Sequence, residues 1–192
     1  MQDALKDTAD SEFIKAEAMY LHSQLHSSSV YGINNTYFDE IVAGINEENF
    51  KLCPTARNMT PAWDLWHITK IEDITASILL CNDEEVFSLS ESLSVKALFA
   101  YRETVGRKTK KFLKTLTLDQ LSKTFLPSQI IRIKDEGAVI PETEGLMNYW
   151  GRKTVSGIIT MPLTKHQIIH LNDCKSIVDK YQKRTKTKCS SH

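Results

Sequence analysis

Three histidines from two separate parts of the chain have the types and spacing of metal ligands. Taking ~100° per residue, His67 lies within about 40° of Ile71 on a helical wheel, in the middle of an apolar face. His166 and His170 are four residues apart, so they lie about 40° apart and one helical turn along, on the same face as Leu163. All three side chains are therefore expected to point into the protein interior.

Three imidazoles in one apolar interior need partners, because a buried ring nitrogen without a hydrogen bond costs free energy. A divalent cation would satisfy all three rings at once. Near neutral pH histidine is mostly uncharged, with an ordinary pKa of ~6.5, so it can bind a cation at little cost in protons. Three neutral ligands leave the double charge of the metal in place and a coordination position open. Such a site lowers the pKa of a bound water to about 7 and can equally hold a thiolate.

Spacing alone does not identify the ligands, because His22 and His26 are also four residues apart. These two rings lie roughly 70° to 110° from the centre of the apolar stripe that runs from Ile14 to Leu25. We predict that this pair lies on the surface. A single histidine on an apolar face is more often a hydrogen-bonded core residue than a ligand, and this alternative stays open for each ring.

Two further polar residues are candidates for the same site. Asp173 lies about 20° from His166 on the wheel, so it is expected to serve as a fourth ligand, a partner of an imidazole N–H, a general base, or only a partly exposed carboxylate. Cys174 is a weaker alternative ligand. Arg102, on an otherwise apolar arc of another predicted helix, either pairs with Asp173, orients an anionic substrate, or reaches along its helix to solvent, which is the more common arrangement.

The tryptophans are predicted to form the core or the wall of a pocket, with Trp63 and Trp150 beside the substrate. Other catalytic signatures are missing from the sequence. It contains no phosphate-binding G-x-x-x-x-G-K-[ST], no dinucleotide-binding G-x-G-x-x-G, no G-x-S-x-G and no H-E-x-x-H. The Glu-x-x-His motifs of a ferritin-like di-iron centre are also missing, so the three histidines carry the functional prediction.

The composition is that of one soluble globular domain: 192 residues, 41% hydrophobic, with 24 Lys and Arg against 24 Asp and Glu. A net charge of zero provides no general attraction to nucleic acid or to an anionic membrane. No apolar run approaches the ~18 residues of a membrane span, and the polar N-terminus does not resemble a secretory signal, so we predict a cytoplasmic protein. The four cysteines form no Cys-x-x-Cys pair and are expected to be reduced thiols.

The elements that must position these residues are predicted to be helices, because seven Gly and five Pro are few for this length. Thr60 before Pro61, and Ser94, are suitable helix caps, and Thr164 with Gln167 has the spacing of a capping box. The segment from 27 to 35 is expected to break the first helix. The helices predicted from periodicity cover residues 11–26, 36–46, 61–80, 94–116, 154–160 and 164–181.

Two parts of the chain lack a helical pattern. Residues 125–150 contain two prolines, two glycines and only a brief apolar run, which predicts a long irregular excursion with a short pair of strands. Long irregular segments within compact domains are more often functional than average. The basic end of the chain, about 183–192, is expected to fray. These features predict one all-α domain over residues 1–192, with four main helices and an N-terminal extension at about 1–33.

The segments TPAWDLWHITKIED, with His67, and WGRKTVSGIITMPLTKHQIIHLNDC, with His166 and His170, resemble the two signature segments of the DinB/YfiT-like superfamily of metal-dependent proteins. NEENFKLCP resembles the connector before the first, and the resemblance spans about residues 34–182. It implies a four-helix bundle with a long crossover connection, commonly a homodimer, that holds zinc or nickel with these three histidines. The N-terminal helix starts earlier than in the superfamily and residues 125–150 are long, so the substrate side need not follow characterised members.

The leading hypothesis is a metal-dependent enzyme that activates a thiol or water nucleophile for a small-molecule substrate. The resemblance implies transferases and isomerases that use low-molecular-weight thiols, and also hydrolases. A site with two positive charges favours thiolate binding, so a thiol-dependent S-transferase is preferred to a hydrolase. The competing hypothesis is a non-catalytic interaction protein whose metal only stabilises the bundle.

Overall fold

The computed structural model describes residues 2–52, 59–83, 94–136 and 144–189, and within these ranges every named element is a helix. One isolated bridge between Thr124 and Thr154 is the only extended pairing among them. The predicted all-α class is therefore confirmed. In the same ranges, no helix has the length and apolar character needed to cross a bilayer.

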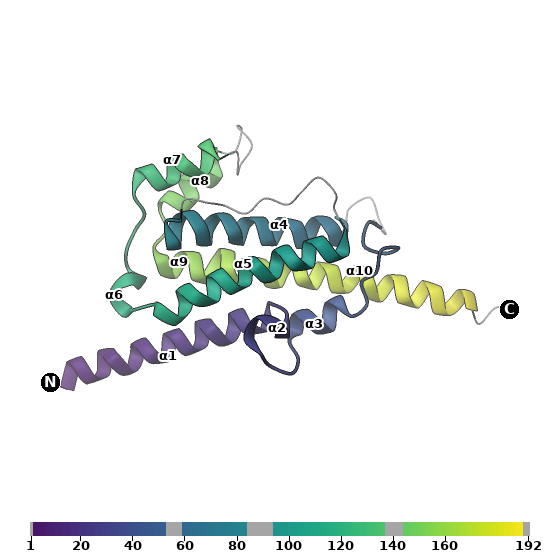
Figure 1. Ribbon diagram of the computed structural model, residues 1–192, viewed down its shortest axis with the longest axis horizontal. Coiled ribbons are helices and arrows are strands. Elements are labelled where there is room, and N and C mark those ends of the chain that lie inside the picture. The colour runs from purple at the N-terminus through teal and green to yellow at the C-terminus, as the bar shows by residue number, and fades with distance from the viewer. Residues whose placement is uncertain (1, 53–58, 84–93, 137–143, 190–192) are drawn as a thin grey trace.

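Four long helical segments form the body of the molecule (Figure 1). The second and third run side by side, the fourth packs against the second, and the first packs on the third. The outer ends of the first and the last project from opposite ends of the bundle, where the two termini lie. These segments are α1 (Gln2–Gln24), α4 (Pro61–Ile74) with its π-helical continuation η1 (Thr75–Cys81), α5 (Val95–Thr115) and α10 (His166–Cys189).

Shorter helices connect the long ones. α2 (Ser28–Tyr31) and α3 (Tyr37–Val42) follow α1, where the sequence predicted a break and a second helix. The remaining short helices gather at the end of the bundle where α1 projects (Figure 1). They are α6 (Leu118–Leu121), α7 (Pro127–Asp135), α8 (Glu144–Gly151) and α9 (Val155–Thr160), and a π-helical turn, η2 (Met161–Lys165), joins α9 to α10.

The helix starts at Thr60 and Ser94 are confirmed. The Thr60 hydroxyl accepts a hydrogen bond from the Trp63 amide at 3.1 Å, and the Ser94 hydroxyl accepts one from the Ala97 amide at 3.1 Å. Each bond satisfies an amide that has no partner inside its helix. The Thr60 cap fixes the start of α4, the helix that carries His67.

The predicted capping box at Thr164 is wrong. The chain continues as a helix from α9 through η2 into α10, and the Thr164 hydroxyl donates to the carbonyl oxygens of Ile159 and Thr160 at 3.1 and 2.8 Å. Pro162 has no N–H to donate to the preceding turn, and the wider π-helical turn accommodates it. His166 consequently lies directly after a π-helical turn, a feature that the capping pattern did not reveal.

The predicted strand pair within residues 125–150 is also wrong for the part that the structure describes, which is helical; residues 137–143 lie outside that part. Gln129 explains the position of α7. Its side-chain oxygen accepts from the Leu126 amide at 2.9 Å, and its Nε2 donates to the carbonyl oxygens of Ile78 and Leu79 at 2.9 and 3.2 Å. These last two bonds join α7 to η1 across a long sequence separation, which a local pattern cannot show.

The buried face of α1 differs from the predicted stripe. Ala18 and Leu25 are buried, but Ile14 and Leu21 are 40% and 41% exposed. His22 and His26, predicted to lie on the surface, are completely buried. α1 therefore turns a different face toward the bundle from the one that the sequence predicted. The reason is that Glu72, on α4, supplies a buried carboxylate that interacts with both rings.

Candidate metal centre

The structure brings the three predicted ligands together. His67 comes from α4, and His166 and His170 come from the first two turns of α10. The ring centroids are 5.0 Å apart for His67 and His166, 4.9 Å for His67 and His170, and 4.6 Å for His166 and His170, with ring planes 66° to 74° apart. One nitrogen from each ring lies within 4.8 Å of the others, so the group is one that could hold a metal ion.

The hydrogen bonds of the site fit a cation. His170 Nδ1 lies 2.7 Å from Oδ1 of Asp64, a buried residue one turn before His67 on α4. Since a histidine that donates from one nitrogen to a carboxylate presents the other nitrogen as a metal ligand, this contact orients His170. Among the described residues, buried His166 Nδ1 has no hydrogen-bond partner. A bound cation would remove the free-energy cost of such an unsatisfied nitrogen.

Burial keeps two of the rings neutral. Burial, followed by the neighbouring His170 and His67, lowers the pKa of His166 to about 4. Burial and then His170 also lower the pKa of His67, although Asp64 opposes the shift. Both rings therefore have a free lone pair near neutral pH, which is the state that binds a metal.

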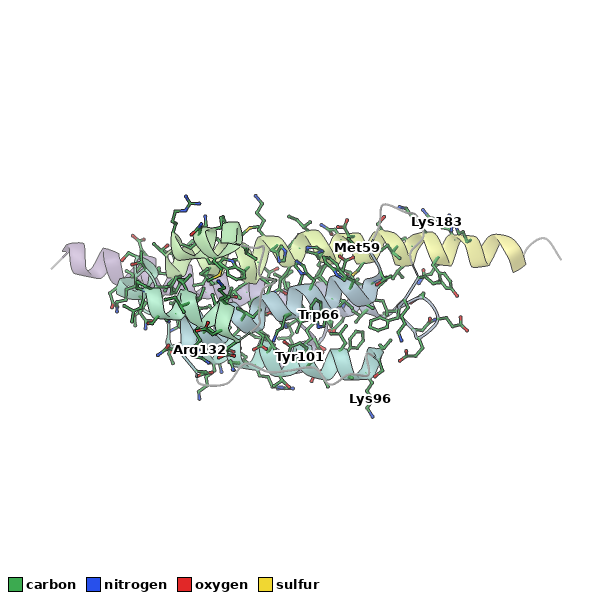
Figure 2. All side chains as sticks on the ribbon, turned by 90° about the horizontal axis from the view of Figure 1, so that it is seen from above. Met59, Trp66, Lys96, Tyr101, Arg132 and Lys183 are labelled. Carbon is green, nitrogen blue, oxygen red and sulfur yellow. The ribbon has the colours of Figure 1, made fainter. Side chains whose placement is uncertain are left out.

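Trp63 forms one side of the centre. Its indole stacks on the His67 ring, with centroids 4.5 Å apart and planes 11° apart, and lies 5.8 Å from the His170 ring. This contact restricts the orientation of His67, although Trp63 is not among the residues found to line the cavity beside the centre. Trp66 lies on α4 (Figure 2), and both tryptophans are 37% exposed, so the core alternative is wrong for them.

A small cavity of about 110 Å³ adjoins the centre. Two of the ligand rings, His67 and His166, are part of its wall. Trp150 is buried and belongs to the same wall, as predicted. The cavity is completed by α8, α4 and η2 through Ile71, Leu146, Tyr149, Met161 and Pro162.

Asp64, rather than Asp173, is the carboxylate that contacts the ring of a predicted ligand, His170. Asp173 is exposed, although one of its oxygens lies within 4.8 Å of ligand atoms of both Asp64 and His170. Asp64 was not singled out from the sequence; its position three residues before His67 on the same helix was the available signal. Buried Cys174 has its Sγ 4.0 Å from Asp64 Oδ2, and burial followed by Asp64 raises the pKa of its thiol. Cys174 therefore packs beneath the site as a neutral thiol.

Arg102 does not reach solvent, so that alternative is wrong. It is 1% exposed, and its guanidinium donates to Thr69 Oγ1, to the Leu25 carbonyl oxygen and to Gln167 Oε1, at 3.2, 2.6 and 2.5 Å. These contacts join α5 to α4, to the turn after α1 and to α10. Such internal hydrogen bonds take the place of the predicted pairing with Asp173 and of a contact with an anionic substrate.

A second group, His22, His26 and Glu72, also has ligand atoms within 4.8 Å of one another, and it is fully buried. The two oxygens of Glu72 receive several contacts. Oε1 lies 2.9 Å from His22 Nε2 and accepts from Thr109 at 2.7 Å, while Oε2 accepts from Gln167 at 2.7 Å and lies 2.9 Å from His26 Nε2. The outer nitrogen of His22 is 2.6 Å from the Tyr31 hydroxyl. Protein groups therefore satisfy both oxygens of Glu72 and both ring nitrogens of His22, whereas His26 Nδ1 has no hydrogen-bond partner among the described residues.

Comparisons of the chain with protein-family models, with curated proteins and with solved structures give no match. The three-His geometry is thus the evidence on which a function for this chain is argued.

Proposed function

We propose that the protein is a metal-dependent enzyme of the DinB/YfiT-like type, in which His67, His166 and His170 hold a divalent cation, zinc or nickel. One observation carries this proposal. The three imidazoles converge beside a cavity whose wall includes two of them, so a cation held there would face space for a substrate.

The surroundings favour catalysis over a purely structural metal. Structural zinc usually has four protein ligands, whereas catalytic zinc has three and an open position. When bound, the cation would lower the pKa of a thiol or water in that open position and so supply a nucleophile near neutral pH. We favour a thiol, because the cavity is lined mainly by apolar side chains, which suit a weakly hydrated group.

Two side chains of the protein, Asp64 and Trp63, orient the ligand rings. Asp64 accepts the Nδ1 proton of His170 and so directs the other nitrogen of that ring toward the centre. Trp63 stacks on His67 and restricts its rotation. The wall beside the centre is lined mainly by apolar side chains, so a substrate that fills the cavity would displace water there and strengthen electrostatic interactions.

The first experiment measures bound metal in the purified wild-type protein and in His67→Ala, by elemental analysis, with circular dichroism as a check on folding. We expect one equivalent per chain in the wild type and at least a tenfold loss of affinity in the variant. Lys165→Ala is a matched control, because Lys165 is exposed and precedes His166 without belonging to the centre. Equal metal content in wild type and His67→Ala would remove His67 from the site and with it the proposal.

The second experiment is a colorimetric screen of the metal-loaded protein with low-molecular-weight thiols and electrophilic acceptors, with an ester panel beside it. Thiol consumption that requires both metal and His166 supports the S-transferase. Ester cleavage without thiol consumption identifies a hydrolase instead. Inactivity across both panels in metal-loaded protein would favour the competing non-catalytic role.

A further inference from the structure

The cavity beside the centre has an uncharged lining. Apart from His67 and His166, its wall consists of aliphatic, aromatic, proline and methionine side chains. Among the residues that the structure describes, no lysine, arginine, aspartate or glutamate belongs to that lining. A carboxylate or phosphate placed there would lose its water without gaining a charged partner from the wall, which is costly.

The size of the cavity limits what fits. An apolar cavity of about 150 Å³ in another protein binds benzene. By that scale, the about 110 Å³ found here holds roughly four or five non-hydrogen atoms. The cavity is partly open, so this volume limits only the group that it encloses. A butyl or isobutyl group is therefore a suitable occupant, whereas a sugar, a nucleotide or the whole of a peptide-like thiol is too large to be enclosed.

The cavity lies next to the proposed cation, so its occupant would lie next to the reacting atom of the substrate. His67 and His166 line the cavity and also converge on the centre, so a group that fills the cavity lies directly beside the proposed cation. Another part of the wall comes from α8, through Leu146, Tyr149 and Trp150. Since Trp150 is buried, that part of the wall is held in place by the core.

We propose that this cavity binds the neutral, short alkyl group of the substrate, and that the substrate class is small uncharged aliphatic molecules with a reacting atom next to an alkyl group of roughly four or five non-hydrogen atoms. Leu146 and Trp150 determine the size limit. This inference rests on the proposed metal centre, which the experiment must therefore test separately.

The experiment titrates alkanethiols of one to six carbons into cobalt-loaded protein, and follows binding by visible absorption. Each added methylene that enters the cavity is expected to tighten binding about fourfold, up to four or five carbons. Longer chains are expected to gain nothing further. Mercaptoacetate, which carries a charge, is expected to bind at least tenfold more weakly than the neutral thiol of the same length.

The same thiols are titrated into metal-free protein, and the methyl signal of Met161 is followed by NMR. Met161 lines the cavity, so butanethiol should shift this signal in the absence of metal and mercaptoacetate should not. This measurement reports on the cavity whether or not a metal binds.

A variant that fills the cavity tests its location. Leu146→Phe should shift the optimum chain length down by two or more carbons without changing the affinity for cobalt. Ile131→Phe is the matched control, because Ile131 is 56% exposed on α7 and does not line this cavity. The two variants should therefore differ in chain-length preference alone.

The outcomes separate the two claims. Three results in a protein that binds cobalt would overturn the assignment of the cavity and leave the metal centre in place. They are a thiol affinity that does not depend on chain length, an equal affinity for mercaptoacetate and neutral thiols, and no shift of the Met161 signal. A Met161 shift with butanethiol in a protein that binds no cobalt supports the cavity and contradicts the proposed function. An optimum that does not change in Leu146→Phe overturns the assignment.

Discussion

The three-His centre and the buried His22, His26 and Glu72 cluster are built from the same parts. Each takes two histidines four residues apart and one residue from α4. The pair comes from α10 in one cluster, and from the end of α1 and the turn that follows it in the other. They differ in the residue that α4 supplies, which is His67 in one and Glu72 in the other. Glu72 supplies two carboxylate oxygens that accept hydrogen bonds, whereas His67 adds a third neutral ring with one N–H and one lone pair.

The burial of the two clusters also differs. The Glu72 cluster is completely buried, and Gly106 allows the His26 ring to pack closely, since a Cβ at that position would lie 2.5 Å from His26 Nδ1. The three-His centre is only partly buried and adjoins a cavity. We infer that one cluster joins α1 to the bundle and the other is free to bind a cation and a substrate. Repeated H-x3-H spacing thus does not distinguish a structural role from a ligand role; the third residue does.

The largest effect is expected for Glu72→Gln. The amide keeps one acceptor oxygen, but it removes the charge and places an NH2 donor opposite groups that donate to Glu72. Disrupting a buried charged network in this way typically costs about 3–5 kcal/mol of unfolding free energy. Urea denaturation of metal-free protein measures this loss. Cobalt affinity per folded chain should change less than threefold. A loss of stability below about 0.5 kcal/mol would show that the cluster does not hold α1 in place.

The matched change in the other region is Asp64→Asn. Loss of the carboxylate beside a ligating histidine typically weakens metal binding about 10- to 100-fold, which is about 1.4 to 2.8 kcal/mol. Competition with a chromogenic chelator gives the affinity. Should Asp64→Asn bind cobalt as tightly as the wild type, the contact with His170 would have no role in orienting a ligand.

The Glu72 cluster should also make stability depend on pH. Burial lowers the pKa of His26 to about 3, against the attraction of Glu72 and with further lowering by His22 and Arg102. In the unfolded chain the pKa of histidine is ~6.5, so between these values the unfolded state binds more protons and stability falls as pH falls, by up to about 1.4 kcal/mol per pH unit.

Glu72 extends this dependence to lower pH. Although burial alone would raise the pKa of Glu72, interactions with His26 and His22 hold it well below its ordinary value. Stability from Glu72 is therefore also lost as pH falls below about 4.3. Urea denaturation of metal-free wild type and His26→Gln between pH 7 and 4.5 isolates the His26 contribution, because His67 and His166 are common to both. Identical slopes would contradict the account.

The smallest effect is expected for Trp63→Leu. The stacked indole contributes about 0.5–1.5 kcal/mol beyond its buried area, and it is partly exposed, so stability should change by about 1 kcal/mol or less. Metal affinity should fall by less than tenfold. Trp66→Leu, on the same helix at the same exposure, is the control and should leave metal affinity unchanged.

The features that could be predicted from the sequence are those that depend on residues close together in the chain. Thr60 and Ser94 cap helices through bonds to residues three positions away. His67, His166 and His170 are half-buried and lie together, as their positions on the helical wheel predicted. Both kinds of pattern are contained in one or two helical turns, so helix starts and inward-facing ligands are predictable from the chain alone.

The features that were missed depend on distant partners. His22 and His26 are buried because Glu72, about fifty residues away, interacts with both, and Arg102 is buried because Leu25, Thr69 and Gln167 accept its hydrogen bonds. α7 lies where Gln129 bonds to η1. In each case a contact with a distant residue offsets the free-energy cost of burying a polar side chain. A local sequence pattern shows the polar side chain but not its distant partner, so it predicts exposure.

X-ray absorption at the metal edge of the purified protein tests the central claim most directly, because it reports which atoms surround the ion. The account predicts three imidazole nitrogens at about 2.0–2.1 Å and one further light atom. A spectrum with two imidazoles and a carboxylate would place the ion in the Glu72 cluster, and a protein without bound metal after loading would leave the three-His centre without its proposed role; either result contradicts the account.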